Sequence, residues 1–108
     1  LPAPLVARLA TLGEDQRIVN VVVTNVPGPS FPLYCRGARM LDAFPVVPLG
    51  GNMTIGVAIL SYDGALNVGI TADATHVPDL DVLREGIEAG FVALGASAQS
   101  APRTAITA

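Results

Sequence analysis

The sequence predicts an α/β fold, more specifically one of the α+β class: a mixed, largely antiparallel β-sheet with flanking helices. Three observations support this prediction. Asp63-Gly64 separates two segments in which apolar residues alternate with small or polar ones, the strongest short-range signal of a β-hairpin. A run of β-branched residues at Arg17–Thr24 indicates a further strand. Apolar residues recur at helical spacing in segments 2–12 and 80–94 of the 108 residues.

The first helix is predicted over Pro2–Leu12. Its leucines, Leu5, Leu9 and Leu12, recur at helical spacing, and Gly13 supplies a C-terminal stop.

The first strand, Arg17–Thr24, follows a polar turn at residues 14–16. Because its β-branched residues occupy both faces, we expect a central strand that is covered on both sides. Proline and glycine in Val26-Pro27-Gly28-Pro29 end the strand abruptly, since proline lacks a backbone donor and fixes φ. A second, shorter strand is predicted over Leu33–Met40, followed by an extended loop over residues 43–52.

The hairpin is the most tightly specified part of the predicted fold. Its strands are Met53–Tyr62 and Leu66–Asp73, and a type I′ turn joins them, because Asp-Gly tolerates the positive φ which that turn needs at both central positions. One face of each strand is apolar, formed by Met53, Ile55, Val57 and Ile59 on the first strand and by Leu66, Val68, Ile70 and Ala72 on the second.

The last helix is predicted to begin at Pro78-Asp79, where acidic groups lie near the positive end of its dipole, and to end at Gly95. Gly86 and Gly90 share one face of it, which allows another backbone to approach closely. Residues 96–108 are small and polar and are predicted to be a flexible C-terminal tail. The apolar stripe of the helix consists of Leu80, Leu83, Ile87, Phe91 and Leu94.

Composition argues against several classes of function. Charged residues make up only 14% of the chain and hydrophobic residues 51%, so we expect part of the surface to pack against something else. The net charge is −3 and the six basic residues are scattered, which argues against a nucleic-acid partner. One histidine and one cysteine cannot form a His/Cys metal site, and no phosphate-binding glycine motif is present.

Cysteine content and hydropathy bear on location. The single Cys35 cannot form an internal disulfide, which fits a reducing compartment, and no signal peptide is evident. The longest uncharged stretch, Ala43–Tyr62, is interrupted by prolines and glycines, so it does not predict a membrane-spanning helix. Any membrane contact is therefore expected to be peripheral.

Three stretches carry a resemblance to a known family. The first is Asn20–Pro29 (NVVVTNVPGP) followed by Pro32-Leu33-Tyr34, and the second is Leu60–Leu66 (LSYDGAL). The third is Ala72-Asp73 with Val77-Pro78-Asp79 after it. In order and spacing, nearly the whole chain resembles the C-terminal domain of the bacterial wax ester synthase/diacylglycerol acyltransferase family.

The resemblance implies that residues 1–95 are one half of a chloramphenicol-acetyltransferase-like two-domain fold. Its N-terminal domain carries an HHxxxDG motif, whose second histidine is the general base on the acceptor hydroxyl. The resemblance also implies acyl-CoA as a substrate with no cofactor, a lipid alcohol or diacylglycerol as acceptor, and a cytoplasmic location that extends to the periphery of the inner membrane or lipid inclusions. The only histidine here, His76, lacks the motif, so we expect the chain alone to be inactive.

By the same resemblance, Asn25 and the Val26-Pro27-Gly28-Pro29 kink lie where the two domains meet, near the tunnel to the catalytic histidine. Two interpretations of Asn25 stay open: it shapes the tunnel, or it caps a strand end. Tyr34 is able to line an acyl pocket or stack on adenine, but a half-buried core position is the commoner role of a strand tyrosine. The other candidates are Val21 and Val23 for the tunnel wall and Arg36 and Arg39 as a weak match to CoA phosphates.

The remaining polar residues predict structural roles. Ser61–Gly64 is explained by turn geometry, and a Ser/His/Asp arrangement of Ser61, His76 and Asp73 lacks the spacing of a nucleophile elbow. Asp73 is predicted to face solvent, with pairing to an arginine as the alternative, and Cys35 to be a small buried hydrophobe.

Two hypotheses of function follow. In the first, the chain is the non-catalytic half of an acyl-CoA-dependent O-acyltransferase and supplies the interdomain face and part of the substrate tunnel. In the second, it is a non-catalytic module that uses the same fold to dock a protein or a lipid. Composition does not separate them, because low charge and a glycine-lined helix serve docking in both cases.

Overall fold

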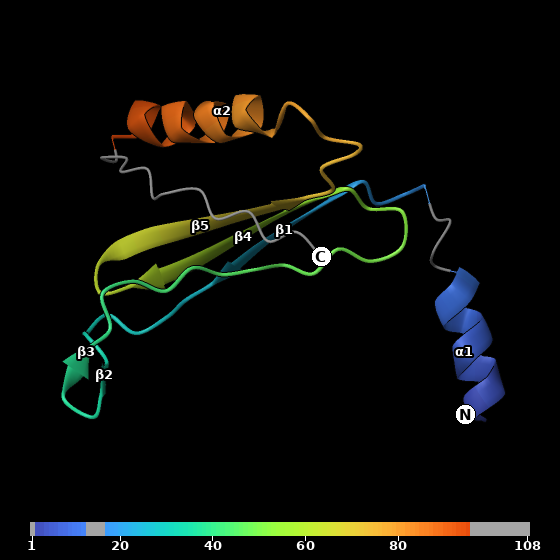
Figure 1. The fold of residues 1–108 in the computed structure, drawn as a ribbon, viewed down its shortest axis with the longest axis horizontal. Coiled ribbons are helices and arrows are strands. Elements are labelled where there is room, and N and C mark those ends of the chain that lie inside the picture. Colours follow the sequence, from blue (N-terminus) through green and yellow to red (C-terminus); the bar gives the residue numbers. More distant parts are fainter. Residues whose placement is uncertain (1, 13–16, 96–108) are drawn as a thin grey trace. The chain divides into compact units, whose positions relative to one another are not determined.

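The computed structural model describes residues 2–12 and 17–95, and it confirms the α+β class (Figure 1). The chain divides into two units, one up to Pro78 and one from Asp79 onward, so the last helix is described apart from the sheet. The elements in chain order are α1 (Ala3–Leu12), β1 (Val21–Val26), β2 (Tyr34–Cys35), β3 (Ala38–Arg39), β4 (Ile55–Tyr62), β5 (Ala65–Ala72) and α2 (Leu80–Ala93).

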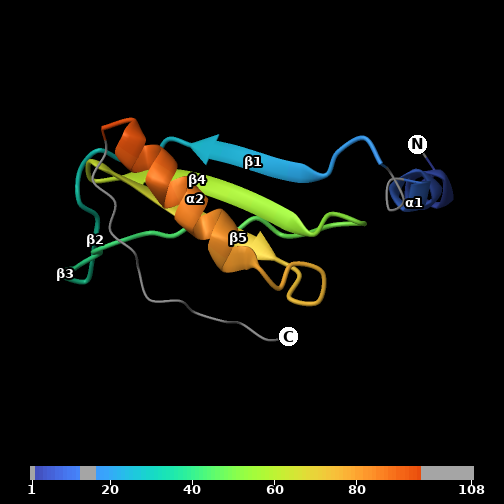
Figure 2. The same cartoon turned by 90° about the horizontal axis from the view of Figure 1, so that it is seen from above.

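The main sheet has three strands in the order β1-β4-β5, so β4 is central (Figure 2). β4 and β5 are antiparallel, whereas β1 runs parallel to β4 with Val21 opposite Ile55. The prediction of a central first strand is therefore wrong for this chain, because β1 lies at the edge. Its valines Val21 and Val23 are 46% and 65% exposed.

Both tight turns of the sheets have positive φ at two successive residues. At Asp63 and Gly64, φ is 46° and 84°, which confirms the predicted type I′ turn between β4 and β5. At Arg36 and Gly37, φ is 48° and 82°, so the segment predicted as one strand is instead the β2–β3 hairpin. The backbone N–H of Met40 closes this hairpin on the Leu33 carbonyl oxygen at 2.9 Å.

The predicted extended loop is confirmed, and it covers one face of the sheet. It passes beside the sheet in Figure 1. The Asn67 side chain is 7% exposed and donates a hydrogen bond to the Ala43 carbonyl oxygen at 2.8 Å. Alternate residues of the loop point away from the sheet, where Phe44 and Val46 are 54% and 73% exposed. Ala43, Pro45, Val47 and Leu49 are partly buried.

Small residues on β4 and β5 allow this close approach. A Cβ atom at Gly56 would lie 3.1 Å from Val47 Cγ1, and a Cβ at Gly69 would overlap the carbonyl oxygen of Pro45. Ala58, opposite Gly69 in the register, is 2% exposed. Of the buried hydrophobic residues in the described part of the chain, Ala58 and Tyr62 lie on the face of β4 that the loop covers, whereas Val57, 8% exposed, lies on the other face.

The helices agree with their predicted extents to within two residues. On α2 the apolar stripe is partly buried except at Leu94, which is 86% exposed, and Gly95 follows with φ 88°. No atom lies within 4 Å of a Cβ built at Gly86 or Gly90. The predicted stop at Gly13, the turn at 14–16 and the tail at 96–108 lie outside the described residues.

Candidate functional site at the end of the first strand

The candidate residues of β1 lie on its two faces according to the parallel register. Asn25 pairs with Ile59 and Val26 with Leu60. Because side chains alternate along a strand, Asn25 shares a face with Val21 and Val23, and Val26 lies on the other face. Asn25 and Val26 are exposed, so Asn25 does not end a buried strand as predicted. All candidates on this face are therefore open in the described part of the chain.

The kink after β1 is fixed against the end of β4. The backbone N–H of Gly28 donates to Ser61 Oγ at 3.0 Å, and the N–H of Asp63 donates to the Pro29 carbonyl oxygen at 2.9 Å. A Cβ at Gly28 would overlap the carbonyl oxygen of Ser61. Only glycine therefore lets the chain lie this close to β4 while both hydrogen bonds form.

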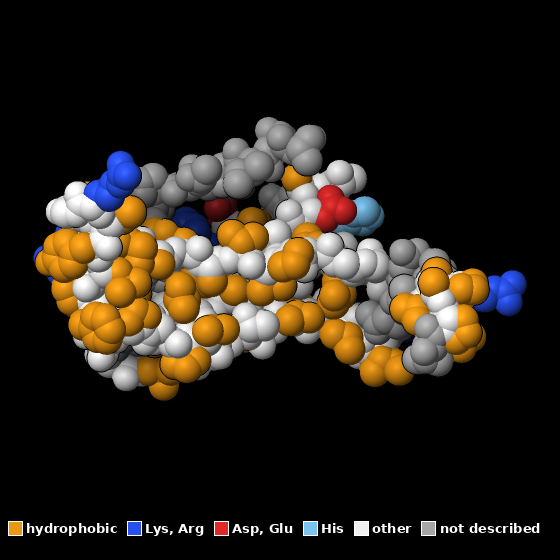
Figure 3. All heavy atoms as spheres, turned by 90° about the horizontal axis from the view of Figure 1, so that it is seen from below, with side chains coloured by type: hydrophobic (Ala, Val, Ile, Leu, Met, Phe, Trp, Pro, Cys, Tyr) orange, Lys and Arg blue, Asp and Glu red, His pale blue; other side chains and the backbone are white. Residues whose placement is uncertain are grey.

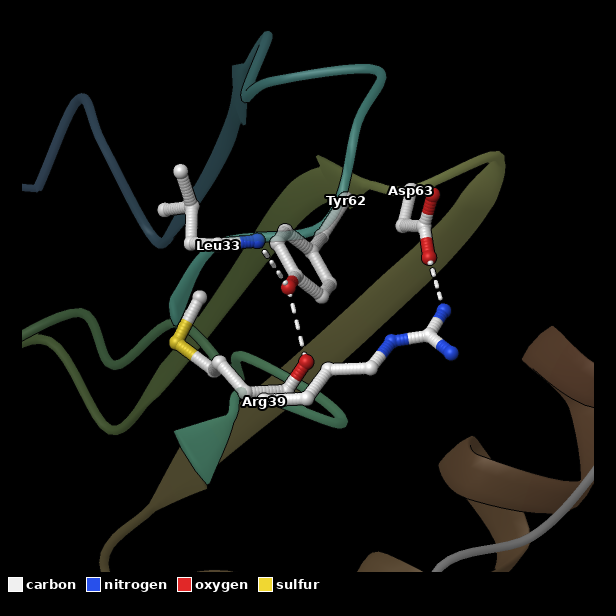
Figure 4. Close-up of polar contacts among 5 residues, drawn as sticks. Leu33, Arg39, Tyr62 and Asp63 are labelled. Atoms are coloured by element: carbon white, nitrogen blue, oxygen red, sulfur yellow. Dashed lines mark hydrogen bonds and ion pairs between the residues drawn. The ribbon is translucent and has the colours of Figure 1, made fainter. Parts of the chain in front are cut away.

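Tyr62 anchors the hairpin that follows the kink (Figure 4). It is 2% exposed, and its hydroxyl accepts a hydrogen bond from the Leu33 N–H at 2.9 Å and donates one to the Met40 carbonyl oxygen at 2.7 Å. Leu33 directly precedes β2, and Met40 directly follows β3. One buried hydroxyl thus ties both ends of the β2–β3 hairpin to the main sheet.

An ion pair adds a second tie between the two hairpins (Figure 4). Arg39 Nη2 lies 2.8 Å from Asp63 Oδ2, and this hydrogen bond and the carboxylate charge raise the pKa of Arg39 above its usual value. Because Arg39 is engaged by Asp63, the two arginines suggested for CoA phosphates are not equivalent. Arg36 lies in the turn and has no ion-pair partner among the described residues.

Sequence reasoning missed the role of Ser61, Tyr62 and Asp63, which it assigned to turn geometry alone. Each of them also holds part of the segment from Gly28 to Met40. The available signal was that a type I′ turn accounts for Asp63-Gly64 but does not explain a serine and a tyrosine directly before it.

Two predictions on β2 are wrong for a common reason. Tyr34 is 63% exposed instead of half-buried, and Cys35 is an exposed free thiol instead of a buried one. A hairpin with two residues in each strand has too little surface to enclose its own side chains.

Replacing Tyr62 with phenylalanine is expected to lower the free energy of unfolding by about 2 kcal/mol, because two hydrogen bonds to partly buried backbone groups are lost. Urea denaturation followed by circular dichroism measures this change. Tyr34→Phe is the matched control, since the Tyr34 hydroxyl has no hydrogen-bond partner among the described residues, and it should change stability little. Equal effects of the two substitutions would contradict the anchoring role of Tyr62.

The one histidine forms a local pair with a carboxylate. The side chain of Asp73 is 39% exposed, as predicted, and its partner is His76 and not an arginine. His76 Nδ1 lies 2.8 Å from Asp73 Oδ2, and the Thr75 N–H donates to Asp73 Oδ1 at 2.9 Å. Asp73 also pairs through its backbone with Thr54. Ser61 lies seven residues further along β4, roughly 23 Å at the rise of a strand, so no Ser/His/Asp arrangement forms.

The hydrogen bond from His76, followed by that from the Thr75 backbone, lowers the pKa of Asp73. A carboxyl whose pKa is lower in the folded state stabilises the fold above its ordinary pKa of about 3.9 and loses this contribution as the pH falls below it. We expect a carbon-detected NMR titration of Asp73 to give a midpoint below the ordinary value. His76→Ala should move the midpoint upward, and an unchanged midpoint would show that the pair does not form in solution.

Neither a metal site nor a membrane span is found in the described residues. Within residues 2–12 and 17–95, no group of three or more His, Cys, Asp and Glu side chains is arranged to hold a metal ion. None of the helices in the same residues combines the length and apolarity needed to cross a bilayer.

Comparison with known proteins gives the family. The family model of the WS/DGAT C-terminal domain matches residues 1–95. Two of the relatives are named "Probable diacylglycerol O-acyltransferase tgs1", from Mycobacterium tuberculosis strains H37Rv and CDC 1551, and each is 44% identical over 90 residues. That alignment covers 82% of this chain but only 19% of each relative, so the chain spans about a fifth of their length. No solved structure matches. On these matches, the chain belongs to the WS/DGAT family and is a C-terminal domain of that family.

Proposed function

We propose that this domain is the non-catalytic half of an acyl-CoA-dependent O-acyltransferase that makes triacylglycerol or wax esters. Its partner is an N-terminal domain with the HHxxxDG motif. The supporting observation is that the family match covers residues 1–95 while the only histidine, His76, is exposed and paired with Asp73. A general base must reach the acceptor hydroxyl within hydrogen-bonding distance, and His76 has no serine or second histidine beside it for such a role.

The reaction sets what the domain has to supply. The acceptor hydroxyl oxygen attacks the thioester carbonyl carbon, the carbon–sulfur bond breaks, and CoA leaves as the thiol with the proton that the base removed. The base belongs to the partner domain in this proposal. What remains for this domain is to hold an apolar acyl chain or acceptor and to exclude water around the reacting atoms.

The open face of β1 fits that task. Val21 and Val23 present an apolar strip, and Asn25 places an amide at its end. The Val26–Pro29 kink, which is hydrogen-bonded to the end of β4, then fixes the position at which this apolar strip ends. In the proposal these residues form part of the tunnel wall at the interdomain face, and Arg36, which has no ion-pair partner among the described residues, is the remaining candidate contact for CoA phosphates.

The test is reconstitution with labelled long-chain acyl-CoA and either diacylglycerol or hexadecanol as acceptor. The purified 108 residues are expected to show no transfer, and transfer should appear when an HHxxxDG-containing domain of the family is added. Transfer by the 108 residues alone would overturn the proposal. Binding to that domain without any transfer would favour the alternative, a docking module that uses the same fold.

Replacing His76 with alanine is expected to leave kcat/KM of the reconstituted enzyme within about twofold of its original value, because its imidazole bonds only to Asp73 in the described structure. Steady-state kinetics measures this. A loss of about a thousandfold, within the range for removal of a general base, would show instead that His76 is catalytic.

For its location, we propose the cytoplasm with peripheral contact to the inner membrane or lipid inclusions. Hydrophobic side chains extend over much of the face shown in Figure 3. Cell fractionation that recovers the protein only in the lumen of another compartment would contradict this location.

A further inference from the structure

β1 combines the sequence of an interior strand with the position of an edge strand. Its six residues, VVVTNV, contain no charge and no proline, and none has positive φ. Natural edge strands are usually protected from further pairing by lysine, proline, a bulge or a covering segment. β1 has none of the first three, and three of its apolar side chains are exposed: Val21 by 46%, Val23 by 65% and Val26 by 54%.

The exposed side chains are distributed over both faces of β1. Val21 and Val23 lie on one face and Val26 on the other, according to the register with β4. The opposite edge of the sheet differs, since β5 has only one exposed large hydrophobic side chain, Leu66 at 56%. A partner that contacts one face of the sheet would leave part of β1 uncovered, whereas a partner strand beside it would cover both faces.

We propose that the open edge of β1 pairs with an extended segment of a longer polypeptide, from outside these 108 residues, which adds a fourth strand to the sheet. Most of the length of the matched relatives lies outside the aligned region, which is 19% of each, so a covalently linked source of such a strand exists in proteins of this kind. The proposal rests on the proposed function, because the added strand belongs to the rest of the acyltransferase.

The chemistry of the edge defines the segment that fits it. Alternate residues of a strand direct their backbone N–H and C=O groups toward opposite neighbours, so half of these groups in β1 point away from β4. Added strand residues would satisfy them and would pack beside Val23 on one face and Val26 on the other. The matching segment is therefore extended, about six residues long, and apolar at alternate positions.

Residue-resolved amide hydrogen exchange tests the pairing directly. In the 108 residues alone, we expect alternating protection along Val21–Val26, with every second amide exchanging fast. When the labelled domain is part of the full-length enzyme, the fast amides should slow by about a hundredfold or more, because they become bonded. Persistence of the alternation in the full-length enzyme would overturn the proposal.

A matched pair of lysine substitutions tests the edge independently. Val23→Lys should weaken association of the domain with the rest of the enzyme by tenfold or more, because lysine is a typical guard of edge strands. Val82→Lys, at a residue of α2 that is 68% exposed and outside the apolar stripe, should leave the affinity unchanged. Thermal unfolding of both variants checks that they fold. Equal affinities of the two variants for the rest of the enzyme would count against pairing at the edge of β1.

Two further outcomes separate this proposal from its alternatives. If sedimentation shows that the full-length enzyme dimerises through this domain, and the dimer protects the same amides of β1, the strand beside β1 belongs to a second copy. The proposal is then wrong. Acyl transfer without protection of β1 would overturn the added strand and leave the proposed function intact. Protection without acyl transfer would support the strand and count against the proposed function.

Discussion

Gly28→Val is expected to reduce acyl transfer by the reconstituted enzyme about a hundredfold, because displacement of a positioning segment by about 1 Å is enough for a loss of that size. The added side chain would overlap the Ser61 carbonyl oxygen. The kink must then move away from β4, which breaks the hydrogen bond from the Gly28 N–H to Ser61 Oγ. Steady-state kinetics with long-chain acyl-CoA measures the loss.

Gly50→Val is the matched control for this substitution. Nothing lies within 4 Å of a Cβ at Gly50, and its φ is not positive, so the same change of residue meets no obstacle there. Activity of this variant should stay close to that of the original enzyme. If Gly28→Val is fully active, the kink is only a turn and the candidate site has to be sought elsewhere.

Gly69→Ala is expected to destabilise the sheet unit by about 3 kcal/mol, at the upper end of what overpacking costs. A single methyl group at this position would overlap the carbonyl oxygen of Pro45. The extended loop must therefore lift from the β4–β5 hairpin, which also strains the hydrogen bond from Asn67 to Ala43. Urea denaturation measures the change in the free energy of unfolding.

The same substitution on α2 should have the opposite sign. Gly86 has open space around it and lies within a helix, so Gly86→Ala is expected to stabilise that helix by about 1 kcal/mol. Far-ultraviolet circular dichroism during thermal unfolding reports on it. An equal and small effect of both alanine substitutions would mean that the loop does not lie on the sheet as described.

Local sequence signals predicted the parts of the fold whose cause is local. The turn at Asp63-Gly64 and the strands on either side of it depend on residues adjacent in sequence, and both were predicted closely. The Arg36-Gly37 turn has the same backbone conformation but was missed. Arginine is an uncommon residue at the first of two positive-φ positions, so the pattern favoured a continuous strand.

The candidate site was only partly predictable, because its geometry depends on residues distant in sequence. The Tyr62 hydroxyl bonds to groups that are 29 and 22 residues away, and no periodicity or turn rule specifies such partners. The Asn25 segment was identified through the family resemblance. The exposure of this segment was mispredicted. The β-branched residues of β1 are typical of an interior strand, but among the described strands β1 has a neighbour on one side only.

The parallel pairing of β1 with β4 has a consequence for the order of folding. Closing the β4–β5 hairpin requires only a two-residue turn, whereas joining β1 to β4 requires closure of the whole segment 27–54. The entropy of that larger loop costs about 2 kcal/mol more. We therefore expect the β4–β5 hairpin to form first, within microseconds to tens of microseconds, and to serve as the template on which β1 assembles late.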